Sequence, residues 1–121
     1  MNEQERTDIK LQVKDGRPYY KGDLFEKSDY LPDNLVVDGE LFCNYSSKKL
    51  PKGLKTQSLC VSETNITEIP NDCEFMGLNM SYTNIRKLKD NLVLVNLIAD
   101  NTLLTKLPKG LKVKGLLDIS H

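Results

Sequence analysis

Leucine or isoleucine recurs at a fixed interval of 19 residues along most of the chain. The first series is Leu31, Leu50, Ile69, Leu88 and Leu107, and proline follows every member except Leu88. A second series begins four residues later, with Leu35, Leu54, Cys73, Leu92 and Leu111. The seven residues KLPKGLK occur twice, at 49–55 and 106–112, which is three such intervals apart. The chain is therefore built from repeated units of 19 residues.

Within the three central units, apolar residues alternate with other residues over a short stretch. The alternating pairs are Leu59 with Val61, Leu78 with Met80, and Leu97 with Ala99. A spacing of two places both side chains on one face of a strand. Threonine and then isoleucine or leucine follow each pair before the next unit begins. We therefore predict a short strand, a turn and an extended return in each unit, with few or no helices, stacked as a solenoid.

The repeated pattern is LxxLxLxxTxIxxLPxxL, and residues 75–92, FMGLNMSYTNIRKLKDNL, are an example of it. This pattern resembles the leucine-rich repeat, in the short bacterial form that carries Leu-Pro. That form occurs in secreted effectors of enteric pathogens and in small proteins of bacteria and their phages. The resemblance implies a leucine-rich-repeat solenoid with short parallel strands on a concave face. It covers five repeats over residues 31–121, of which the last is incomplete.

The resemblance departs from the family at one column and at both ends of the chain. Thr64, Thr83 and Thr102 stand where the family places the asparagine that binds the adjacent coil, and a hydroxyl can also bind backbone groups. The first and last units have one extra residue before the strand, which predicts a bulge or wider turn at Gly39 and Gly115.

The two ends of the solenoid give different predictions. Residues 1–30 contain Asp15-Gly16 between two alternating stretches, which indicates an N-terminal cap with a probable β-hairpin. No cap follows the last unit. Residues 116–120 could pair with a second copy or with a partner, or the five units could bury enough surface without a cap.

Residues that alternate with the buried ones should face solvent on the concave side. They form three columns: Glu40, Ser58, Gly77, Asn96 and Leu116; then Phe42, Cys60, Asn79, Ile98 and Asp118; then Asn44, Ser62, Ser81, Asp100 and Ser120. We predict a protein-binding face from all of these except Gly77, Leu116, Ser62 and Ser120. Apolar anchors in a polar surround are typical of protein interfaces, and Phe42 and Ile98 supply them. Isolated surface hydrophobic residues are also common in proteins without such an interface.

A second candidate surface is the edge that carries the Leu-Pro turns. Its basic residues are Lys49, Lys52, Lys55, Arg86, Lys87, Lys106, Lys109 and Lys112. They could follow a phosphate backbone in a nucleic acid or another polyanion. Glu68, Asp72 and Glu74 interrupt the series, no aromatic residue is interleaved to stack on bases, and the net charge is zero. A solvated turn surface is the favoured interpretation of this edge.

Composition and candidate chemistry point away from catalysis. The chain has 121 residues, 28% of them charged, and a single histidine, His121, which is too poorly placed to orient as a general base. Cys43 and Cys73 fall on buried positions, and nothing near Cys60 in the repeat should activate its thiol. We expect no cofactor and no metal. The absence of a signal segment or membrane span, with three cysteines, favours the cytoplasm of a bacterium or of an infected host cell.

The sequence therefore predicts a non-catalytic protein-binding module, with Phe42, Asn79, Ile98 and Asp100 as central contacts. By analogy with the resembled family, it would be a small bacterial or phage-encoded inhibitor or effector that occludes a protein partner. Two alternatives stay open: polyanion binding along the lysine-rich edge, and structural self-assembly through residues 116–120.

Overall fold

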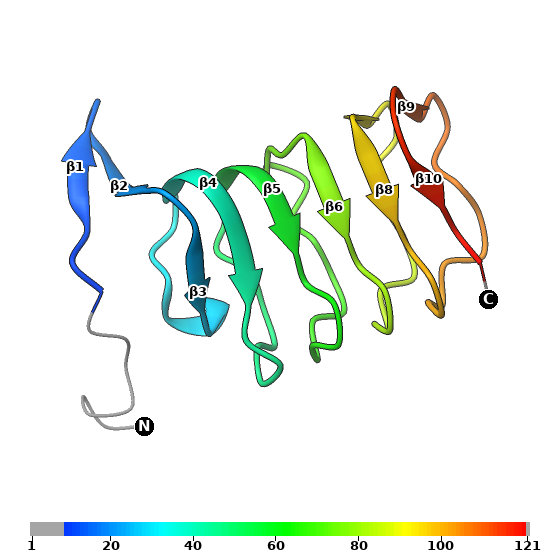
Figure 1. Cartoon of the computed structure of the whole chain (residues 1–121), viewed down its shortest axis with the longest axis horizontal. Helices are drawn as coiled ribbons and strands as arrows, with labels where there is room; N and C mark the ends of the chain where they lie inside the picture. Colours follow the sequence, from blue (N-terminus) through cyan, green and yellow to red (C-terminus); the bar gives the residue numbers. More distant parts are fainter. Residues whose placement is uncertain (1–8, 121) are drawn as a thin grey trace.

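A computed structural model describes residues 9–120 as a single row of stacked coils (Figure 1). The strands are β1 (Gln12–Lys14), β2 (Arg17–Lys21), β3 (Leu24–Glu26), β4 (Val36–Cys43), β5 (Lys55–Cys60), β6 (Gly77–Asn79), β7 (Val93–Leu94), β8 (Asn96–Ile98), β9 (Lys112–Val113) and β10 (Leu117–Asp118). Helix is limited, within the described residues, to one 3₁₀ turn at Ser28–Tyr30. No helix among them is long and apolar enough to cross a membrane.

The main sheet pairs strands that are one repeat apart. β4, β5, β6, β8 and β10 lie side by side in parallel, each bonded to the next. Leu59 pairs with Leu78, and Leu78 pairs with Leu97, so that each coil advances the chain by 19 residues in the middle of the stack. This register confirms the predicted β-rich solenoid of short parallel strands.

The first and last coils of the predicted repeat each contain one extra residue. Leu41 pairs with Leu59 but Val37 pairs with Thr56, so the β4–β5 register shifts between Val37 and Glu40. Gly39 lies at this bulge, and a Cβ there would come within 2.6 Å of the Gly22 backbone. In the last coil, Lys114 and Gly115 form a bend between β9 and β10. The irregularities predicted at Gly39 and Gly115 are therefore confirmed.

The N-terminal end begins with a hairpin and continues as an additional coil. β1 and β2 pair antiparallel around Asp15 and Gly16, which confirms the hairpin-like cap. β2 also pairs in parallel with the first half of β4, and β3 pairs in parallel with its second half. Parallel stacking therefore starts well before Leu31. Residues 1–8 and 121 of the segments named in the sequence analysis lie outside the described residues.

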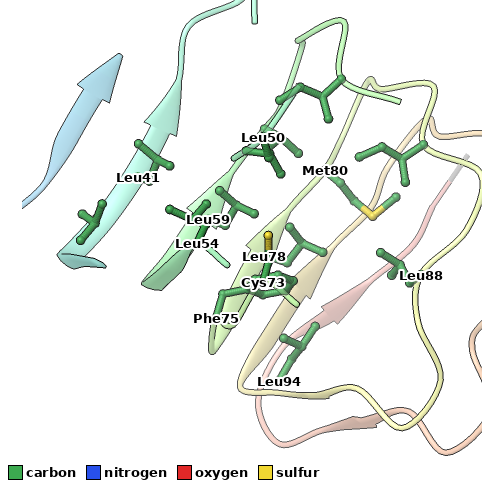
Figure 2. Close-up of a cluster of buried hydrophobic side chains, with 14 of the residues drawn as sticks. Leu41, Leu50, Leu54, Leu59, Cys73, Phe75, Leu78, Met80, Leu88 and Leu94 are labelled. Atoms are coloured by element: carbon green, nitrogen blue, oxygen red, sulfur yellow. The ribbon is translucent and has the colours of Figure 1, made fainter. Parts of the chain in front are cut away.

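The core consists of apolar columns that run through successive coils (Figure 2). The leucines of β4, β5, β6 and β8 are buried, and Leu54, Cys73 and Phe75 belong to the same buried cluster. Thr64 and Thr83 are also buried. Each of these hydroxyls donates to the carbonyl oxygen three residues earlier, at 2.6 Å, so it closes a turn in its own coil rather than binding the adjacent one. Every buried polar side-chain atom in the described residues has a hydrogen-bond partner.

The last coil is much less covered than the coils before it. Leu97 is fully buried, whereas Leu117, its partner on β10, is 45% exposed. Leu88 and Leu107 show the same contrast, since Leu88 is buried and Leu107 is 43% exposed. Among the described strands, β10 pairs with β8 alone, which agrees with the greater exposure of this coil.

Candidate protein-binding face

We call the solvent side of β3, β4, β5, β6, β8 and β10, with the residues that directly precede and follow these strands, the strand face. Its columns are in register as the sequence predicts. Glu40, Ser58, Gly77 and Asn96 are paired in succession, and so are Phe42, Cys60, Asn79, Ile98 and Asp118. The predicted contacts on these two columns therefore lie on one continuous surface.

The central column has one more aromatic member than the sequence analysis found. Phe25 of β3 pairs with Phe42 of β4, and their rings stack with centroids 4.3 Å apart and planes inclined by 3°. Phe25 is 69% exposed and Phe42 is half-buried. Residues 1–30 lack a Leu-Pro pair, so the sequence predicts Phe25 in the N-terminal cap and not on this column. The apolar Leu24 directly before Phe25 was the sequence feature that could have indicated a strand here, with one side chain buried and the next exposed.

Several polar residues of the strand face are used by the fold itself. The Oδ1 atom of Asn79 accepts the Ser81 N–H at 3.1 Å, and the Ser81 hydroxyl accepts the Asp100 N–H at 3.1 Å. Ser81 is buried, so this predicted contact is not available at the surface. The Oδ1 atom of Asn44 likewise accepts hydrogen bonds from the N–H and the hydroxyl of Ser46.

A side chain at the start of β8 also binds the backbone of the neighbouring coil. The Oδ1 atom of Asn96 accepts the Leu116 N–H at 2.9 Å. Side-chain amides and hydroxyls along this surface therefore end strands and tie neighbouring coils together.

The charges of the strand face are mainly acidic. Asp23 precedes β3 beside Glu40, and Asp100 lies near Asp118. Burial first, and then the Asp23 charge, raises the pKa of Glu40, against a lowering effect of the Ser58 hydroxyl. The side-chain interaction with Asp118, followed by hydrogen bonds from Ser120, lowers the pKa of Asp100. Lys27 lies near the N-terminal end of the face, over the ring of Tyr30.

The cysteines are placed as packing residues. Burial raises the pKa of Cys43 to about 12 and that of Cys73 to about 11. Cys60 lies on the strand face, half-buried, and burial raises its pKa as well. Raised pKa values keep these thiols protonated at neutral pH, so they are weak nucleophiles. Among the described residues, no three His, Cys, Asp or Glu side chains are grouped to hold a metal ion.

The lysine-rich edge is exposed but discontinuous. All eight basic residues named for it are exposed. Acidic residues occupy some of the equivalent positions in other coils. Glu68 stands one repeat after Lys49, and Asp90 stands one repeat before Lys109. The backbone of Glu74 forms an isolated parallel β-bridge with that of Lys55. An open hollow of about 500 Å³ near Arg86 and Lys87 is also lined by Glu68 and Asp90. Neutral and negative positions therefore interrupt the positive ones along the stack, so the basic residues do not form one continuous stripe.

Comparison of the chain with models of protein families, with curated proteins and with solved structures gave no match.

Proposed function

We propose that this protein is a non-catalytic binding module that engages another protein through the strand face. The observation that carries the proposal is the stacked Phe25–Phe42 pair, in which Phe25 is exposed and Phe42 half-buried, at one end of an ordered row that also contains Ile98. Large apolar side chains exposed in a polar surround are typical anchors of protein interfaces. The strands hold these anchors on a rigid sheet, which lowers the conformational entropy lost on binding.

The mechanism that fits such a surface is occlusion. A rigid row of short strands covers a patch on its partner and prevents other molecules from reaching that patch. The resemblance to the short Leu-Pro type of leucine-rich repeat extends this proposal to a small bacterial or phage-encoded inhibitor or effector in the cytoplasm. That extension depends on the sequence pattern.

Affinity capture from lysate of the source organism tests the proposal when variants are compared. The double variant Phe42→Asp with Ile98→Asp adds two charges to the strand face at half-buried positions. We expect a protein that is retained stoichiometrically by the unchanged chain, with or without nuclease, to be lost by this variant. Val13→Asp is the matched control because Val13 is 79% exposed and lies in β1, outside the strand face. Retention by the double variant would contradict the proposal.

A second candidate function is self-assembly through residues 116–120. Leu116 and Leu117 are both exposed in the last described coil, and β10 pairs only with β8 among the described strands. An open strand edge beside exposed leucines can pair with a second copy. Sedimentation over a range of concentrations tests this: Leu117→Asp should abolish a concentration-dependent dimer, and a strict monomer at high concentration would contradict it.

Polyanion binding ranks below both proposals because neutral and acidic residues interrupt the basic residues of the lysine-rich edge. If nucleic acid were the ligand, the protein captured from lysate would disappear on nuclease treatment. Binding would also fall steeply with salt concentration.

A further inference from the structure

We propose that the N-terminal end of the strand face holds a site for an arginine side chain, made by Asp23, Phe25, Glu40 and Phe42. This inference rests on the proposed function, since it names the chemistry that a protein partner would present there. We call these four residues the aromatic–acidic site.

The register of two neighbouring strands brings the four side chains together. Phe25 pairs with Phe42 across β3 and β4, and Asp23 precedes Phe25 by two residues as Glu40 precedes Phe42. Residues two apart on a strand point to the same side of the sheet. The Oδ1 atom of Asp23 accepts the Glu40 N–H at 2.8 Å, which fixes one carboxylate next to the other strand. The site is therefore two carboxylates beside two stacked rings.

Both parts of this site are incompletely paired in the free protein. The parallel rings leave a flat aromatic surface open to solvent, because Phe25 is 69% exposed and β3 pairs only with β4 among the described strands. Burial and the like charge of Asp23 disfavour the ionised form of Glu40 more than the Ser58 hydroxyl favours it. The described residues form no ion pair with either carboxylate. A cation from a partner would relieve the repulsion between the two carboxylates.

The shape of the site favours arginine over lysine. A guanidinium group is planar, so it can stack on a phenyl ring while its N–H groups donate in the same plane to carboxylates. Charge-assisted hydrogen bonds of this kind are stronger than neutral ones. A lysine ammonium group is a compact, strongly hydrated charge and gains less from a flat ring.

The other carboxylate pair on the strand face provides an internal comparison. Asp100 and Asp118 lie at the opposite end of the sheet, and Ile98 is their apolar neighbour in the register. Asp100 already accepts hydrogen bonds from the N–H and hydroxyl of Ser120, at 3.1 and 2.9 Å. This pair lacks the aromatic surface and is better satisfied, so it should not select for arginine.

Amide NMR titration of the whole chain tests the site without a known partner. The probe is N-acetyl-arginine-methylamide, and the comparison compounds are its citrulline and lysine equivalents. Citrulline keeps the shape of arginine without the charge. We expect saturable shifts centred on the amides of residues 22–25 and 39–42 with the arginine probe. The lysine compound should bind at least threefold more weakly, and the citrulline compound should give no saturable shift.

Two variants localise the effect while the same spectra report whether the fold is kept. Glu40→Gln should weaken binding of the arginine probe at least fivefold, and the matched change Asp100→Asn should leave it unaltered. Equal binding by Glu40→Gln and the unchanged chain, or equal response to arginine and citrulline, would overturn the inference. Because this titration uses no partner, the result is independent of affinity capture. Probe binding without a captured protein would remove only the proposed function, and capture without probe binding would remove only the arginine site.

Discussion

At the scale of single residues, six of the described positions other than glycine adopt a left-handed backbone conformation. They are Asp15, Asn34, Glu63, Tyr82, Asn91 and Asn101. Asparagine and aspartate tolerate this region because their short side chains can form local hydrogen bonds, whereas a tyrosine there is unusual. Tyr82 has φ 56° and follows the strand face in the same turn that Glu63 and Asn101 occupy in neighbouring coils. An exposed tyrosine therefore occupies a backbone conformation that is unfavourable for it.

The first prediction is that Tyr82→Asn stabilises the protein by about 1 kcal/mol, because asparagine costs less in this conformation. Urea denaturation measures the change. Tyr45→Asn is the control, since Tyr45 is also exposed and its φ is not positive. A stability gain of equal size at Tyr45 would show that loss of the exposed ring, and not relief of strain, is the cause.

The second prediction compares two glycines with similar φ angles. Gly53 has φ 68°, and a Cβ at this position would lie 2.2 Å from the Oδ1 atom of Asn34 in the preceding coil. Gly16 has φ 75° and no atom within 4 Å of such a Cβ. We expect Gly16→Ala to cost about 1 kcal/mol in unfolding free energy and Gly53→Ala at least about 2 kcal/mol.

The test of this prediction is chemical denaturation of both variants, and of Gly53→Ala combined with Asn34→Gly. The second change removes the obstructing side chain and keeps a residue suited to φ 64°. It should recover much of the lost stability. Equal costs for the two single variants would contradict the close approach of coils at Gly53.

At the scale of elements, Arg17 connects the hairpin to the solenoid. Its Nε donates to the Asn34 carbonyl at 2.9 Å, and its Nη2 donates to the Gly53 carbonyl at 2.7 Å. One side chain therefore binds the turns of two successive coils. We expect Arg17→Ala to lower the unfolding free energy by about 1 kcal/mol and to reduce hydrogen-exchange protection in β2 more than in β6. A uniform loss of protection in both strands would contradict this local role.

The elements also show what the sequence could and could not predict. The 19-residue series of leucines is enough to predict parallel coils, and the extra residue before two strands is enough to predict bulges. The coil that contains β3 was not predicted, because Leu24 precedes Leu41 by 17 residues and Leu31-Pro32 by 7, and neither interval fits the 19-residue series. Phe25 was missed for that reason. The burial of Ser81 depends on the turn made by the Asn79 side chain, which alternation does not reveal.

At the scale of the whole molecule, stacking determines which charges become neighbours. The frequent lysines of the sequence suggest a basic stripe, but the coils pair Glu74 with Lys55, and Glu68 and Asp90 line one hollow together with Arg86 and Lys87. The same stacking places Asp23 next to Glu40 and Asp100 near Asp118 on the strand face. A molecule of zero net charge therefore has a mixed edge and an acidic strand face, so electrostatic complementarity favours a basic partner at that face.

The last prediction concerns how stability is distributed along the stack, where each coil contacts only its neighbours. Leu97→Ala and Leu117→Ala remove the same atoms from two paired positions of one column. Leu97 is fully buried between coils, so its loss should cost about 3 kcal/mol, whereas Leu117 is 45% exposed and should cost about 1 kcal/mol. Denaturation at two protein concentrations measures both costs. If a second copy covers the last coil, the cost of Leu117→Ala will rise with concentration while that of Leu97→Ala will not. Equal costs at low concentration would contradict the partial burial of the last coil.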